Sequence, residues 1–156
     1  MYQRMNQWLV RMALGLLIIA LPGCITVVAP TQEPEAQQQP ASTSQLTVQA
    51  NQGWQDTGIL VQSGNILTVK YLSGQWCAWG GGCFDGLGDG DPVNNSVLDY
   101  AKHASLIGRI GDNAPFSVGN EYTQPASQTG SLSLRMNDVL LNDNSGSITV
   151  SITVAR

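Results

Sequence analysis

Strict alternation of apolar and hydroxyl residues near the end of the chain constrains the fold most strongly. Between residues 147 and 154 every second residue is Ile or Val, and those between are Ser or Thr. Successive side chains of a β-strand point to opposite faces, so this pattern predicts a strand with one buried and one solvated face. Residues 132–136 alternate in the same way. Further short strands are expected at 46–50, 57–61, 66–71, 106–110 and 116–118.

Turn signals rich in Gly and Asn separate these segments, as in Ser63-Gly64-Asn65. Many short strands with such turns predict an all-β domain, a small β-sandwich or jelly roll. Only residues 96–105 are expected to hold a helical turn. Residues 46–156 are enough for one domain with a single core. They carry five basic and nine acidic residues, and this excess of acid argues against nucleic-acid binding through phosphates.

The front of the chain carries an address signal. Arg4 and Arg11 precede an apolar run over residues 12–21, which is too short to span a bilayer comfortably and predicts a secretory signal over residues 1–23. Its end, Leu21-Pro22-Gly23-Cys24, resembles the bacterial lipoprotein signal. That resemblance implies cleavage before Cys24 and acylation of it, including palmitate. The chain would then be exported and lipid-anchored to the membrane at the cell envelope, at the outer membrane or cell surface. The alternative is a plain signal peptide with a chance cysteine.

A Gln- and Pro-rich stretch follows the signal. Residues 24–45 contain few apolar side chains towards their end, so they are expected to form a flexible tether before a folded domain at 46–156. A tether of this kind indicates where a domain works and not what it does.

The Gly-rich middle of the domain, residues 74–92, is predicted to be a long loop. Within it, Cys77 and Cys83 are expected to form a disulfide in an oxidising compartment. A zinc site is the alternative, but the sequence has a single histidine, His103. Three acids of the loop are a weaker calcium candidate, because their spacing lacks the EF-hand frame. They are Asp85, Asp89 and Asp91.

A second loop, between the two alternating runs near the end of the chain, brings Asp138, Asp143 and Asn144 close together. Calcium prefers several oxygens from carboxylates, amides and backbone carbonyls, and this loop supplies all three. An ordinary hairpin turn is the alternative interpretation, because Asn, Asp, Ser and Gly are also common turn residues.

Short motifs over most of residues 53–156 resemble the PA-IL-like family of calcium-dependent, galactose-binding bacterial lectins. The matching segments are 54–59, 61 with 64, 74–76, 106–111, 115–119, 130–134, 137–138 and 144–147. The resemblance implies a small β-sandwich of the galactose-binding-domain-like, PA-IL type, with one calcium ion at its loop end.

The resemblance also implies a ligand set. Side chains of Asp138, Asp143 and Asn144 would bind calcium together with the carbonyls of Trp79 and Leu141, with Leu140 as the alternative to Leu141. Asp91 and Asn94 align with a His and a Gln that reach a sugar hydroxyl in the family. Three departures stand out: a shorter calcium loop, Asp143 in place of an Asn, and Asp91 in place of the His.

Two functions follow as expectations. The first is a calcium-dependent carbohydrate-binding module, for galactose-type or other glycans, on an envelope lipoprotein. Trp76 and Trp79 are its candidate stacking platforms. The second is a non-enzymatic envelope lipoprotein of the same fold, with structural or no calcium and a protein partner. The sequence leaves oligomerisation open.

Enzymatic activity is not expected. The sequence has no Gly-x-Ser-x-Gly elbow, and the acid pairs of the Gly-rich loop have no fixed separation. His103 stands beside Lys102 and is expected to be a solvated surface residue.

Overall fold

The computed structural model describes residues 41–90 and 95–156. The predicted signal and Cys24 lie outside the described residues, as does the tether up to residue 40. Within the described part of the chain, no helix is both long and apolar enough to cross a membrane.

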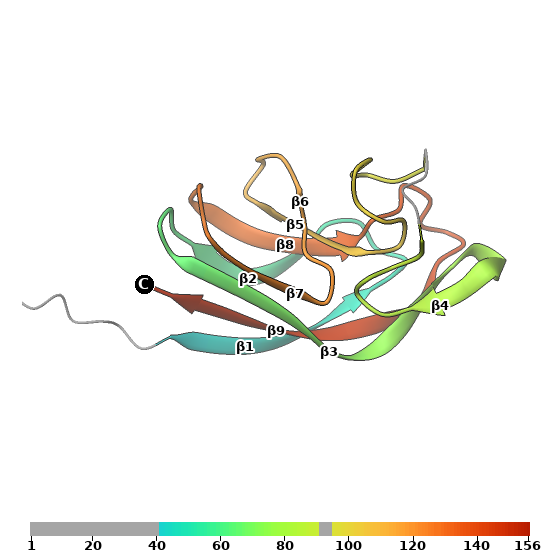
Figure 1. Cartoon of the computed structure of the whole chain (residues 1–156), viewed down its shortest axis with the longest axis horizontal. Coiled ribbons are helices and arrows are strands. Elements are labelled where there is room, and N and C mark those ends of the chain that lie inside the picture. The colour runs from blue at the N-terminus through green and yellow to red at the C-terminus, as the bar shows by residue number, and fades with distance from the viewer. Residues whose placement is uncertain (1–40, 91–94) are drawn as a thin grey trace, which may run out of the picture. The chain divides into compact units, whose positions relative to one another are not determined.

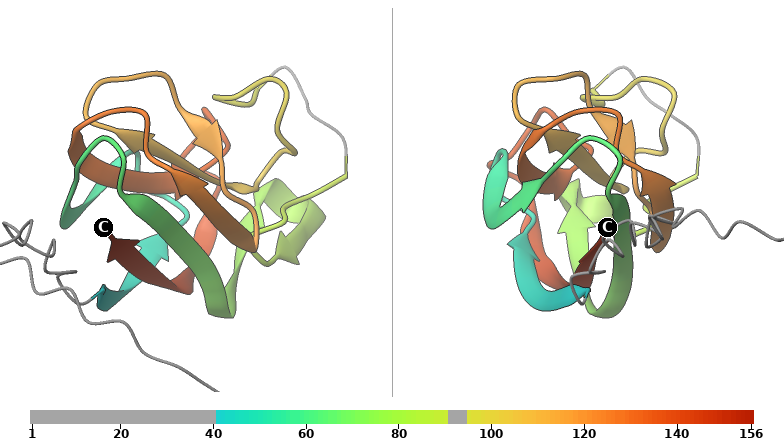
Figure 2. Two further views of the ribbon diagram at one scale, coloured as in Figure 1. Left: turned by 60° about the vertical axis from the view of Figure 1, so that its left-hand side comes forward. Right: turned by 90° about the vertical axis from the view of Figure 1, so that its left-hand side faces the viewer.

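The domain is a sandwich of two antiparallel sheets (Figure 1). Its elements are β1 Ser42–Gln49, β2 Gln55–Val61, β3 Ile66–Ala78, the 3-10 turn η1 Trp79–Gly81, β4 Gly82–Phe84, β5 Leu106–Ile110, β6 Phe116–Ser117, β7 Glu121–Pro125, β8 Gly130–Met136 and β9 Ser145–Ala155. One sheet has the order β1-β9-β3-β4, with β7 also paired to β3, and the other has the order β2-β8-β5-β6. Figure 2 shows the two sheets as facing layers. The expectation of a small β-sandwich is confirmed.

Alternation places the core between these layers. Ile148, Val150 and Ile152 of β9 are buried on one inner face, and Leu132, Leu134 and Met136 of β8 are buried on the other. Burial of each such side chain contributes roughly 1.5–3 kcal/mol, so the pattern that predicted the strands also supplies the stabilisation. The predicted strand at 106–110 coincides with β5.

The first strand begins earlier than expected. Residues 42–45, assigned to the tether from sequence, pair with residues 151–154 of β9. Their polar side chains misled the sequence prediction, because residues 42–45 are exposed on both faces of the strand and so show no apolar alternation. There the hydroxyls of Thr43 and Thr153 lie 2.8 Å apart.

The Gly-rich segment is only partly a loop. β3 continues through Ala78 and turns back into β4, so the prediction of a long loop starting at Gly74 was wrong. Gly74 has a φ of +94°, and a Cβ there would lie 2.5 Å from the carbonyl oxygen of Ser147 on β9. Glycine is therefore needed at this position of β3, because only a residue without a Cβ lets the backbones of β3 and β9 approach so closely. The helical turn expected within residues 96–105 is absent, and these residues form turns and bends instead. Strand β7 was not predicted, because its sequence does not alternate between apolar and polar residues.

Candidate functional site

A pocket of about 310 Å³ opens where the β3–β4 hairpin meets the β8–β9 loop. Its lining residues come from four separate segments: Trp79, Asp89, Asn95, His103, Asp138, Leu140 and Asp143. Ser42 and the C-terminal residue lie at the opposite end of the sandwich, because Ser42 pairs with Val154 near the end of β9. Figure 1 shows the C-terminus and the β4 hairpin at opposite ends of the domain.

Asp138 directly follows β8 and is the most deeply buried acid of the pocket, with 3% of its surface exposed. Its Oδ1 accepts a hydrogen bond of 2.9 Å from the backbone N–H of Leu140, which tightens the loop. Its Oδ2 lies 3.7 Å from Nε2 of His103. One carboxylate oxygen thus orders the loop, while the other faces the imidazole.

His103 is buried, with 8% exposed, so its expected position as a solvated surface residue was wrong. Its carbonyl accepts a hydrogen bond of 2.7 Å from the N–H of Asp89, and its Nδ1 lies 3.5 Å from Oγ of Ser96. The next residue, Ala104, has a φ of +55°, an uncommon value for a residue with a Cβ. The backbone conformation turns His103 inward, and no local sequence pattern signals such a turn.

Asn137 explains how this turn is held. Its side chain is fully buried and joins the end of β8 to the loop over residues 95–105. Its Oδ1 accepts from the N–H of Leu98, and its Nδ2 donates to the carbonyls of Leu98, Ala101 and Lys102 at 3.0 to 3.2 Å. The two residues of the Asn-Asp pair therefore have different roles. Asn137 holds the loop over residues 95–105, and Asp138 faces the pocket.

Trp79 lies on the rim of the pocket with 61% of its surface exposed. It stands in η1, between Cys77 and Cys83, which form the predicted disulfide and face each other across β3 and β4. Its φ is +43°, a conformation that is costly for a tryptophan, and the residue lies within the ring that the disulfide closes. The indole is available as a flat apolar surface beside the acids.

Trp76 does not share this position. It is fully buried in the core, and its Nε1 donates a hydrogen bond of 2.8 Å to the carbonyl of Ala104. Its prediction as a stacking platform was therefore wrong, because alternation along β3 turns Trp76 inward. The bond instead ties the core to the residue that follows His103.

The side chain of Asn144 bears most directly on whether a cation fits this loop. Its side chain is buried and its Nδ2 donates to the carbonyl of Leu140 at 2.6 Å, while its Oδ1 has no hydrogen-bond partner among the described residues. A buried acceptor without a donor costs free energy, and a bound cation would satisfy it. Leu140 lines the pocket, while the carbonyl of Leu141 accepts from the N–H of Asn144 at 3.4 Å. Asp143 is exposed and lines the same pocket.

The candidate metal-binding atoms of these residues are all oxygens, which suits a hard cation such as calcium. Residues 41–90 and 95–156 contain no group of three His, Cys, Asp or Glu side chains placed to hold a metal. A calcium shell here would combine carboxylates with amide and backbone carbonyl oxygens. The residues that would hold it are Trp79, Asp138, Leu140 or Leu141, Asp143 and Asn144.

The two other described acids of the Gly-rich segment, Asp85 and Asp89, have different roles. The carboxylate of Asp85 accepts from the N–H of Leu87 at 2.8 Å and from Nδ2 of Asn120 at 3.0 Å, so it orders the turn after β4. Asp89 lines the pocket. The predicted sugar ligands Asp91 and Asn94 lie outside the described residues.

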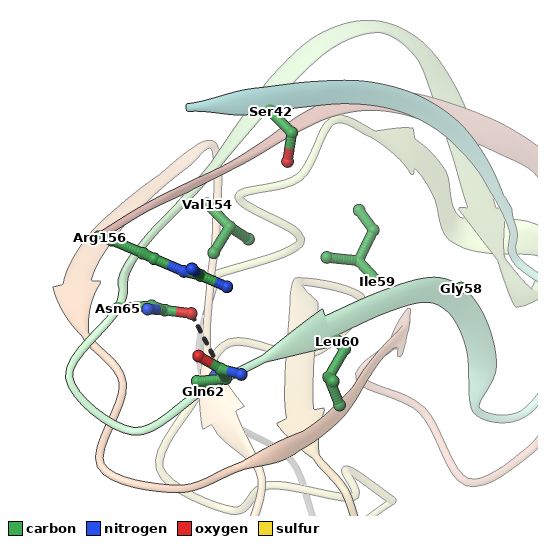
Figure 3. A pocket seen from close by; sticks show the side chains of 8 residues that line it. All are labelled: Ser42, Gly58, Ile59, Leu60, Gln62, Asn65, Val154 and Arg156. Atoms are coloured by element: carbon green, nitrogen blue, oxygen red, sulfur yellow. Dashed lines mark hydrogen bonds between the residues drawn. The ribbon is translucent and has the colours of Figure 1, made fainter. Parts of the chain in front are cut away.

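A second cavity, of about 350 Å³, lies at the other end of the sandwich (Figure 3). Ile59, Leu60 and Val154 line it together with Arg156, and Asn65 accepts a hydrogen bond from the N–H of Gln62 beside them. Its eight lining residues include no Asp, no Glu and no aromatic side chain. The acids Asp138 and Asp143, predicted to bind calcium, and the exposed indole of Trp79 instead line the pocket at the loop end.

Comparison with known proteins supports the fold. The sequence matches no family model and no curated protein. Among solved structures, the chain is similar to the N-terminal domain of EclA, described as a PllA-like lectin, with a TM-score of 0.55 and 21% identity. The match covers 70% of this chain and 94% of that domain. The described domain therefore shares the β-sandwich fold of that domain.

Proposed function

We propose that this domain is a calcium-dependent carbohydrate-binding module. One observation supports the proposal most strongly: Asp138, Asp143 and the exposed Trp79 line one pocket, and the next residue, Asn144, has a buried Oδ1 without a hydrogen-bond partner in the described part of the chain. The acids and the amide oxygen suit calcium, and sugar hydroxyls readily complete a calcium shell built of oxygens. The likeness to a lectin domain adds weight to this choice among ligands.

Trp79 supplies the second part of a sugar site. An indole face packs against the apolar face of a pyranose ring, while the polar atoms of the pocket take its hydroxyls. Galactose-type ligands are the first to test, because the motifs of the chain resemble the PA-IL-like lectins. The proposed function is binding alone, with no catalytic step.

The placement of the pocket agrees with a surface-anchored binder. We propose that Cys24 carries the lipid anchor, and the described chain enters the domain at Ser42, opposite to the pocket. β9 spans the distance with 11 residues, roughly 35 Å at the usual rise of a strand. The pocket thus lies at the end of the domain far from Ser42.

The test combines calorimetry with a glycan array. Calcium should bind the purified full-length chain with micromolar to millimolar affinity, and glycans should bind in calcium but not in chelator. An Asp138→Ala variant serves as the control for both measurements. Absence of calcium binding at millimolar concentration would contradict the cation site and the calcium-bridged sugar together. Calcium binding without any glycan would favour the alternative, an envelope lipoprotein with structural calcium and a protein partner.

A further inference from the structure

Arg135 is a buried cation directly behind the pocket. It occupies an outward-facing position of β8, between the core residues Leu134 and Met136, yet only 9% of its surface is exposed. A charged side chain is seldom buried unless its donors find partners. The partners of Arg135 therefore indicate why a charge is kept at this position.

The guanidinium binds the backbone on either side of Asn137. Nε donates a hydrogen bond of 3.0 Å to the carbonyl of Met136, and Nη2 donates to the carbonyl of Asp138. Bonds from a charged donor are about twice as strong as those between neutral groups. The fork thus spans the point where β8 ends and the loop with the predicted cation ligands begins.

Trp54 covers this guanidinium. The Cζ atom of Arg135 lies 5.6 Å from the centroid of the Trp54 ring, and the Cζ atom of Arg109 lies 4.7 Å from it. Burial lowers the pKa of Arg135 from its ordinary value, an effect that Asp138 opposes and Arg109 reinforces. The indole and the carbonyls hold Arg135 in one place despite this cost.

We propose that Arg135 is a positioning residue for the cation loop, resting on the proposed function. By holding the carbonyl of Asp138, it fixes the backbone of that residue and so directs the carboxylate towards the pocket. With the backbone of Asp138 held, the N–H of Leu140 donates its hydrogen bond to Oδ1 of Asp138. Arg135 itself touches neither cation nor sugar, and no sequence motif singled it out.

Two variants separate positioning from charge. Arg135→Lys keeps the positive charge but loses the rigid fork, whereas Arg135→Gln removes the charge and keeps a single amide donor group. If Arg135 positions Asp138, both variants should weaken calcium binding about tenfold. If Arg135 acts only through its charge, Arg135→Gln should tighten calcium binding and Arg135→Lys should leave it unchanged, which would overturn the proposal.

Arg109→Lys is the matched control. Arg109 lies over the same Trp54 ring, but it makes no hydrogen bond to the loop among the described residues. Its replacement should leave the calcium affinity within about twofold. An equal loss of affinity in both Lys variants would show that general packing at Trp54 is responsible, and would refute positioning by Arg135.

Hydrogen exchange provides a readout that needs no metal. In the calcium-free full-length chain, the Leu140 amide should exchange about tenfold faster in Arg135→Lys than in the wild type, and Arg109→Lys should leave it unchanged. This measurement decides the positioning claim even if the wild type binds no calcium, an outcome that would refute only the proposed function. Unchanged exchange in Arg135→Lys would refute positioning. Should that variant not fold, Trp54→Phe loosens the same guanidinium and should give a smaller increase.

Discussion

The carboxylate of Asp138 and the imidazole of His103 face each other inside the domain, with Oδ2 and Nε2 separated by 3.7 Å. Both side chains are buried, with 3% of Asp138 and 8% of His103 exposed. The contact joins the end of β8 to the turn before β5, two segments that are distant in sequence. The local stability of the pocket therefore depends on a pair that only the fold creates.

His103→Ala should lower the free energy of unfolding in chelator by about 1–3 kcal/mol, because it removes the imidazole that faces the buried Oδ2 of Asp138 and opens a cavity. Urea unfolding curves at neutral pH measure this loss. Lys102→Ala, at the adjacent position, is the control and should change stability by less than about 0.5 kcal/mol. Equal curves for the wild type and His103→Ala would argue against the contact.

Calcium should raise the melting temperature of the wild type, because a ligand that binds only the folded state stabilises it by mass action. At a hundredfold excess over Kd the gain is about 2.7 kcal/mol, on the order of 10 °C for a domain of this size. Asp138→Ala should abolish the rise, and Asp143→Asn should reduce it while leaving it detectable. Asp112→Ala, at an exposed turn, is the control and should respond as the wild type does.

Regular strands were predictable because a buried face imposes a two-residue period wherever one sheet surface meets the core. Residues 132–136 and 147–154 show that period, and the structure confirms them as strands. The β3–β4 hairpin was missed because Gly74 looks unfavourable in a strand until the approach of β9 is known. No local property of β3 reveals that contact.

The residues of the pocket were likewise only partly predictable from the sequence. Trp79, Asp138 and Asp143 were predicted from loop composition and resemblance, and the structure places all three in one pocket. His103, which lines the pocket, and Arg135, which binds the backbone behind it, were not predicted as site residues. His103 is followed by a positive φ at Ala104, and Arg135 turns back onto the carbonyls of Met136 and Asp138, its own neighbours in the chain. Neither feature leaves a periodic mark on the sequence.

The disulfide should stabilise both the domain and the ring that carries Trp79. Replacing Cys77 and Cys83 together by Ser should cost about 2 kcal/mol, since a loop this short removes little entropy from the unfolded chain. Urea unfolding measures that term, with dithiothreitol-treated wild type as the comparison. A loss far above this value would mean that the ring also supports the fold beyond its own hairpin.

The lipid anchor is tested on the mature protein. Mass spectrometry should find Cys24 as its first residue, carrying acyl groups, because the preceding segment resembles a bacterial lipoprotein signal. Cys24→Ser should release the protein from the membrane fraction, as two or more acyl chains are needed for stable anchoring. An unmodified Cys24 in the wild type, or a different first residue, would rule the anchor out.

Trp79→Ala should separate the cation from the sugar. The expected calcium ligand of Trp79 is its backbone carbonyl, which the variant keeps, so calcium affinity should remain within about threefold of the wild type. The ring is lost, and glycan binding should weaken by about 0.5–1.5 kcal/mol, or roughly twofold to tenfold. Trp79→Gly tests the backbone as well, because glycine accepts the φ of +43° without strain. Calorimetry with calcium and then with glycan measures both steps. Loss of calcium binding in both variants would place the indole itself in the support of the cation site, contrary to its proposed role as a sugar platform.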